Sequence, residues 1–161
     1  MTDANFVRVP NFLAHDELRA GQDEMIEAAH EAFAGSGSHL AAAPTGIGKT
    51  AAALSAALDV AAMSPNRRII FFLTGRQSQH RIVVETVREI NSRRPSGQRK
   101  IGLVDIVGQQ SMCIDEIRFE FSSLFSRLCA EKRSNRKCIP YLQESDGLQL
   151  KGLEDPLHVS E

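Results

Sequence analysis

One stretch decides how this chain folds: Ala43-Pro44-Thr45-Gly46-Ile47-Gly48-Lys49-Thr50. Its two glycines allow the backbone to curl tightly, so that successive N–H groups point at a bound phosphate. Lys49 is placed to reach the β- and γ-phosphates of a nucleotide, and the Thr50 hydroxyl is placed to bind Mg²⁺. These two are the candidate catalytic residues. A helix that starts here adds the positive end of its dipole. The stretch predicts a nucleotide-binding P-loop, with Ala43 where the usual pattern has glycine.

Segments with helical and strand-like patterns alternate on both sides of this loop. Apolar residues recur at helical spacing in three segments, and short apolar runs lie between them. Strand, helix, strand, helix, strand is the order of a parallel α/β sheet. We therefore expect an α/β protein with a parallel sheet. The predicted helices are residues 16–33, 51–63 and 82–90, and the predicted strands are residues 40–43, 69–73 and 101–107.

The pattern changes after Gly108. A helix is predicted from Ile114 to Leu128, and the chain beyond it is polar, basic and rich in turn residues, without a strand pattern. The expected organisation is a lead-in over residues 1–15, a nucleotide-binding domain over 16–107 and an inserted domain from 108 to 161.

Charge and cysteine content point to a compartment. The net charge is −1 over 161 residues, and no stretch has the pattern of a signal peptide or a membrane span. An odd number of cysteines without a secretion signal favours a reducing cytosol. We expect a cytoplasmic or nucleoid-associated protein that is not secreted and has no membrane partner.

Two short basic runs lie in the C-terminal two thirds of the chain. Such a run is usually a solvated surface, and a nucleic-acid path is the second hypothesis. The runs are Arg93, Arg94, Arg99 and Lys100, followed by Lys132, Arg133, Arg136 and Lys137.

Taken together, the segments from residue 17 to 141 resemble the iron–sulfur helicases of superfamily two, the XPD and DinG type. The segment from Leu18 to Met25 is similar to the family's Q-type segment, which implies that Gln22 reads the adenine edge. An amide can donate and accept at once, as that edge requires. Alanine at the first position of the loop is common in this superfamily, which accounts for Ala43. The resemblance implies a RecA-like motor domain that binds ATP and Mg²⁺ through residues 43–50.

The segment after the second predicted strand is similar to the family's motif Ia. The resemblance implies that it contacts the phosphates of bound single-stranded DNA, and a polar loop that caps the next helix is the alternative. The implied DNA contacts are Thr74, Arg76, Ser78 and Gln79.

Cys113, Cys129 and Cys138 resemble three of the family's four cluster cysteines. The resemblance implies a small helical domain with a [4Fe–4S] cluster, but a fourth cysteine is absent. Two alternatives stay open, which are buried packing of the cysteines and a zinc site completed by His158.

The family completes its ATPase site with an Asp-Glu-Ala-His segment, which this sequence does not contain. We therefore expect the N-terminal portion of an ATP-dependent 5′-to-3′ DNA helicase of the repair type, catalytically incomplete alone. The alternatives are another P-loop ATPase or kinase with structural cysteines, and a zinc-dependent binding module.

Overall fold

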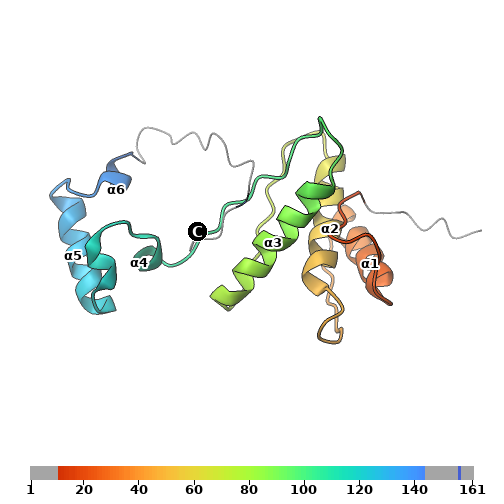
Figure 1. The fold of residues 1–161 in the computed structure, drawn as a ribbon, viewed down its shortest axis with the longest axis horizontal. Coiled ribbons are helices and arrows are strands. Elements are labelled where there is room, and N and C mark those ends of the chain that lie inside the picture. The colour runs from red at the N-terminus through yellow and green to blue at the C-terminus, as the bar shows by residue number, and fades with distance from the viewer. Residues whose placement is uncertain (1–10, 144–155, 157–161) are drawn as a thin grey trace, which may run out of the picture. The chain divides into compact units, whose positions relative to one another are not determined.

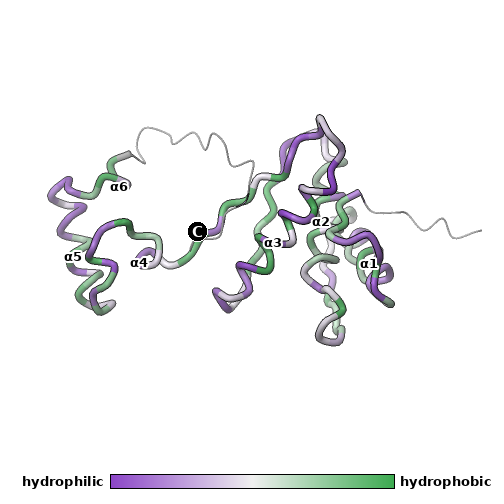
Figure 2. The backbone as a smooth tube through the Cα atoms, in the orientation of Figure 1, coloured by the Kyte–Doolittle hydropathy of each residue, from purple (hydrophilic) through white to green (hydrophobic). Residues whose placement is uncertain are grey.

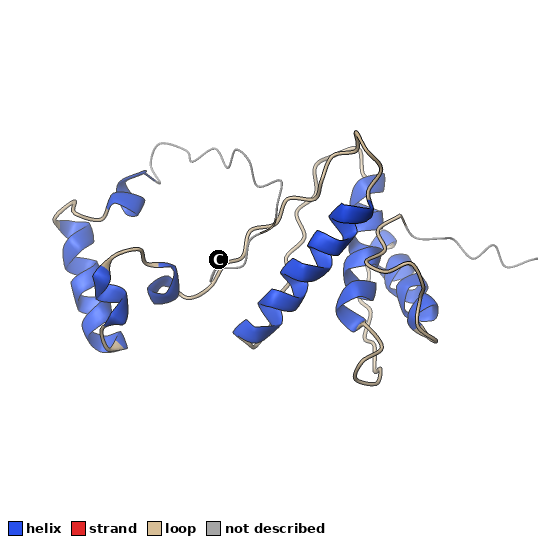
Figure 3. Ribbon diagram, in the orientation of Figure 1, coloured by secondary structure: helices blue, strands red, loops and turns tan. Residues whose placement is uncertain are grey.

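The computed structural model describes residues 11–143 and Pro156. In that part the chain forms helices joined by loops (Figure 3). Its contacts divide it into two compact units, residues 1–101 and 102–161. The first unit contains α1 (Gln22–Ala34), α2 (Lys49–Met63) and α3 (Gln77–Arg93), and the second contains α4 (Gln109–Met112), the 3₁₀ helix η1 (Glu116–Phe119), α5 (Ser122–Ser134) and α6 (Ile139–Gln143) (Figure 1).

The core of the first unit lies where α1 packs on α2. Ile26 and Ala29 of α1 are buried against Ala52 and Ala56 of α2. Alanine side chains on α2 let the two helix backbones approach closely and also favour the helix intrinsically. α2 lies between α1 and α3 (Figure 1), so one helix carries both packing faces.

α3 contributes a stripe of buried apolar residues and one buried polar side chain that bonds to the backbone after the helix. Val84, Val87 and Ile90 are buried on one face of the helix. Asn91, which is also buried, donates from Nδ2 to the Ile101 carbonyl at 3.0 Å and accepts from the Ile101 N–H at 2.8 Å. The amide thereby satisfies both backbone groups of Ile101 and fixes the chain that returns after the helix.

The predicted parallel sheet is wrong for the part of the chain that the structure describes. Residues 40–43, 69–73 and 101–107 contain no strand. Contacts between helices, and not a sheet covered by helices, form the core of the first unit. The α/β assignment is therefore corrected to an all-helical arrangement in residues 11–143.

Exposure along residues 69–73 gives the physical reason for this error. Phe71 and Leu73 are 79% and 87% exposed, whereas Ile70 and Phe72 are 37% and 38% exposed. An exposure period of two is expected of an extended segment covered on one face only. A central parallel strand needs cover on both faces. The apolar run is plain in Figure 2, but an apolar run alone does not reveal which faces are covered.

The three helices predicted in the first unit are present, but two of them start elsewhere: α3 begins at Gln77 and not at residue 82, and the start of α1 is also shifted. α1 begins at Gln22 and not at the predicted Asp16. Gly21 has φ 78°, a left-handed conformation that a right-handed helix does not continue through. The Gln22 N–H donates to the Arg19 carbonyl at 2.9 Å, so a turn precedes the helix. Leu18 packs on the core from this turn, which explains why helical spacing extends too far toward the N-terminus.

The second unit corrects the helix predicted from Ile114 to Leu128. That segment contains η1 and the first half of α5. Asp115 starts a separate 3₁₀ helix in this segment, because its carboxylate accepts from the Ile117 N–H at 3.2 Å and caps the N-terminus of η1. Phe125 and Cys129 are the buried residues of α5.

Candidate functional site

The stretch from residue 43 to 50 folds as a turn that leads directly into a long helix. Gly46 and Gly48 have φ values of 92° and 89°. Only glycine takes up this left-handed conformation without strain. Gly48 is the N-cap residue of α2, so Lys49 and Thr50 stand in its first turn, as the motif predicts. Two tight positive-φ positions before a 15-residue helix are the backbone features that a phosphate-binding loop needs.

The Lys49 ammonium is exposed, and it bonds to backbone carbonyl oxygens at the start of its own loop. Its Nζ donates to the carbonyl oxygens of Ala43 and Pro44, each at 2.9 Å. An ammonium has three donors on a flexible stem and can exchange neutral carbonyl oxygens for charged phosphate oxygens. Thr50, half-buried beside it, supplies the hydroxyl predicted to bind Mg²⁺.

The turn before α1 packs against this loop residue by residue. Arg19 donates from its guanidinium to the Gly46 carbonyl, and Gln22 donates from Nε2 to the Gly48 carbonyl at 3.3 Å. Between them, the Ile47 side chain lies 3.6 Å from where a Cβ of Gly21 would stand. We call residues 19–22 the anchor segment. The resemblance marks Gln22 alone, and the contacts of Arg19 and Gly21 are a finding of the structure.

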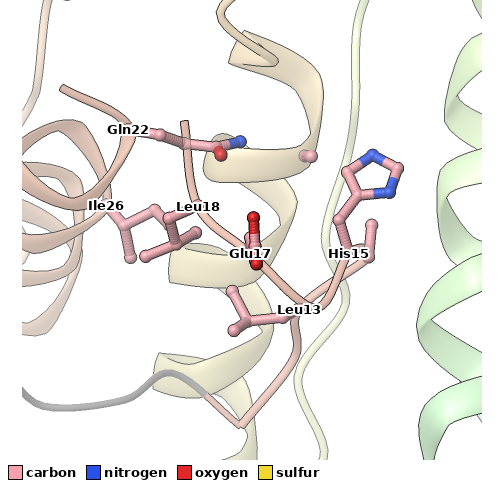
Figure 4. Close-up of a pocket in the computed structure, with 8 residues that line it drawn as sticks. Leu13, His15, Glu17, Leu18, Gln22 and Ile26 are labelled. Carbon is pink, nitrogen blue, oxygen red and sulfur yellow. The ribbon is translucent and has the colours of Figure 1, made fainter. Parts of the chain in front are cut away.

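Both polar atoms of the Gln22 amide are bonded within the chain. Oε1 accepts from the Arg19 N–H at 3.1 Å, while Nε2 donates to Gly48. The residue is 3% exposed. Figure 4 shows its amide reaching from the start of α1 toward α2, at the edge of a pocket that Leu18 and Ile26 also line. That pocket has a volume of about 10 Å³, which is room for about one water molecule.

The predicted DNA-contacting residues lie at the start of α3. Arg76 precedes the helix, and its carbonyl accepts from the Thr74 hydroxyl at 3.1 Å and from the Gln79 N–H at 3.0 Å. Arg76, Ser78 and Gln79 are exposed, and Thr74 is half-buried. Their DNA role stays a prediction.

The three cysteines all lie in the second unit as free thiols. Cys129 is buried on α5, while Cys113 and Cys138 are half-buried. Among residues 11–143 and Pro156, no three cysteine, histidine or carboxylate side chains come close enough to hold one metal ion. Cluster binding by the three cysteines stays a prediction from the resemblance. His158, the alternative zinc ligand, lies outside the described residues.

An ion pair joins the segment that follows Cys113 to α5. Lys132 Nζ contacts Asp115 Oδ2 at 2.5 Å, and the Cys113 thiol donates to the Asp115 carbonyl at 3.9 Å. The hydrogen bond from Lys132 lowers the pKa of Asp115, and the bond from the Ile117 N–H lowers it further. The same ion pair raises the pKa of Lys132, with smaller contributions from the Cys113 and Cys138 thiols.

Several residues of the basic runs are engaged within the chain. Arg93 pairs with Asp16 at 3.3 Å and with Glu89 at 3.0 Å. Arg94 lies over the Phe12 ring at 4.7 Å, and Arg133 lies over the Tyr141 ring at 5.6 Å. These contacts give the arginines a structural role. Binding of nucleic acid by the two basic runs stays a prediction.

Comparison with known proteins leaves the site to be interpreted from its own geometry. No family model, curated protein or solved structure matches the chain. Within the part that the structure describes, no helix has the length and apolar character to cross a membrane.

Proposed function

We propose that residues 43–50 bind the phosphates of ATP with Mg²⁺, and that the chain acts as the nucleotide-binding portion of a DNA helicase of the iron–sulfur type. The observation that carries the phosphate-binding proposal is the turn itself. Two left-handed glycines precede α2, and the lysine and threonine of the motif stand in its first turn. The backbone N–H groups at that helix start have no partner within the helix, and the dipole there favours an anion.

The helicase part of the proposal rests on the order of the segments. The anchor segment, which resembles the Q-type motif, contacts the loop through Arg19 and Gln22. This contact explains physically why a Q-type segment and a phosphate-binding loop would occur together in one chain. In this proposal single-stranded DNA is the partner, and residues 74–79 at the start of α3 bind its phosphates.

A titration of the chain with ATP tests the proposed function. Because the sequence contains no Asp-Glu-Ala-His segment, Thr50 is the one predicted Mg²⁺ ligand and nothing is assigned to orient the attacking water. We expect saturable, Mg²⁺-dependent ATP binding by calorimetry, with at most trace hydrolysis in a phosphate-release assay. Absence of ATP binding by the folded chain would contradict phosphate binding, and robust DNA-stimulated turnover would contradict catalytic incompleteness.

The DNA proposal has a separate test in the salt dependence of binding. Each phosphate contact with a single strand contributes a slope of about −0.7 to the plot of log affinity against log salt concentration. Arg76→Ala should weaken binding of an oligothymidylate and flatten this slope by about that amount. Arg67→Ala removes another exposed arginine of the first unit and is the matched control. Equal slopes for the Arg76 and Arg67 variants would contradict DNA binding by residues 74–79 and favour the alternative that they only cap the helix.

A further inference from the structure

The anchor segment contacts three consecutive residues of the loop, and the polar atoms of its Gln22 amide are bonded within the chain. Arg19 bonds to Gly46, Gly21 lies against Ile47, and Gln22 bonds to Gly48. We infer that this segment positions the loop, and that the site therefore binds nucleoside triphosphates through their phosphates without selecting the base. The inference rests on the proposed phosphate-binding function and narrows its substrate class.

Two of these bonds orient backbone N–H groups. In a trans peptide the C=O and the N–H point in opposite directions, and the described chain contains no cis peptide bond. The Gly46 carbonyl is held toward Arg19, so the N–H of Ile47 is turned away from the anchor segment. The Gly48 carbonyl accepts from Gln22 and from the Ala52 N–H of α2 at 3.0 Å, so the N–H of Lys49 is turned away from both donors. Both N–H groups are thus set before any anion binds, which lowers the ordering cost of binding.

Gln22 has little capacity left to read a base. Recognition of adenine by an amide requires an exposed donor and an exposed acceptor at the base edge. Here one donor and one acceptor are used within the chain, and the 3% exposure of the residue leaves the others out of reach. The pocket beside it, at about 10 Å³, is far smaller than a nucleobase needs. Gln22 is therefore a positioning residue in this site.

Titration with a set of triphosphates distinguishes positioning from base recognition. The full chain is titrated with ATP, GTP, CTP and inorganic triphosphate, each with Mg²⁺. We expect dissociation constants that agree within about threefold, because phosphate contacts are common to the set. Gln22→Met, which keeps the length of the side chain without its hydrogen bonds, should weaken all of them together by about tenfold. Gln98→Met, in an exposed loop, is the matched control and should change none of them.

The wild-type comparison needs no variant and stands even if Gln22→Met fails to fold. ATP binding at least about tenfold tighter than GTP and inorganic triphosphate binding overturns the inference, because that gap is larger than shared phosphate contacts produce. It leaves phosphate binding intact. Absence of binding by any of these ligands, inorganic triphosphate included, overturns the proposed function and the inference with it. Equal affinities with a uniform loss in Gln22→Met support both.

Discussion

Replacement of Lys49 by alanine should weaken ATP binding by about tenfold to a hundredfold, because hydrogen bonds from a charged donor contribute about 1.5–3 kcal/mol. The ammonium is exposed at the start of α2 and donates to two neutral carbonyl oxygens, those of Ala43 and Pro44. A triphosphate offers charged oxygens to the same donors, so the ammonium gains by exchanging partners. The variant loses this gain and keeps the helix, because alanine is the best helix former.

The matched control for this variant is Lys137→Ala, which removes one exposed lysine from the second unit. Its ATP affinity should equal that of the wild type in calorimetry. Circular dichroism of both variants should match the wild type, which separates loss of binding from loss of fold. Equal ATP affinity in Lys49→Ala and Lys137→Ala would count against the assignment of residues 43–50 as the phosphate site.

Gly48→Ala should reduce both the stability of the first unit and its affinity for ATP. A side chain at φ 89° is strained, which costs about 1–3 kcal/mol. The new Cβ would also stand 2.7 Å from Gln22 Nε2, closer than contact permits. The Gln22 bond to the Gly48 carbonyl would then break, and the loop would lose one of its supports. We expect a lower midpoint in urea unfolding together with weaker ATP binding.

Substitutions at two other glycines separate the effect of backbone strain from the effect of losing the contact between Gln22 and Gly48. Gly97→Ala places a Cβ at φ 87° with no neighbour within 4 Å and lies outside the loop, so it should lower stability without changing ATP affinity. Gly46→Ala has φ 92° and equally open surroundings, so it should disturb the loop without displacing Gln22. If Gly48→Ala behaves like Gly97→Ala in both measurements, the contact between Gln22 and the loop has no role in binding.

The helices were predictable because their pattern is local. Ile26 and Ala29 in α1, and Val83, Val87 and Ile90 in α3, recur at the spacing of one helix face, and the structure buries them. The start of α1 was misplaced because Leu18 is partly buried from a turn and mimics one more helical position, and α3 begins at Gln77 and not at residue 82. The helical spacing of apolar residues continues before Gly21, but the helix itself begins only after it.

The sheet was not predictable correctly because a strand depends on partners distant in the sequence. Residues 69–73 have the apolar composition of a buried strand, yet Phe71 and Leu73 are largely exposed in the structure. Nothing within a five-residue run states whether a neighbouring strand will pair with it. Parallel pairing in particular requires contacts across a whole crossover connection.

The candidate site was predictable in its motif and not in its support. Gly46, Gly48 and Lys49 follow from the sequence pattern, and the structure places them at the head of α2 as expected. Arg19 bears no motif of its own in the residue pattern, and only the packing of α1 on α2 brings it to the Gly46 carbonyl. The Asp115–Lys132 ion pair was missed for the same reason, since opposite charges far apart in sequence give no pairing signal.

In the proposed site, residues 46–50 present backbone N–H groups to a phosphate chain, and amide NMR detects such contacts residue by residue. The ¹⁵N-labelled chain is titrated with inorganic triphosphate and Mg²⁺, which removes any contribution from a base. We predict saturable shifts concentrated in the amides of residues 46–50, with smaller shifts in the anchor segment at residues 19–22. No saturable shift in the loop, or shifts centred instead on the basic run at residues 93–100, would contradict the claim.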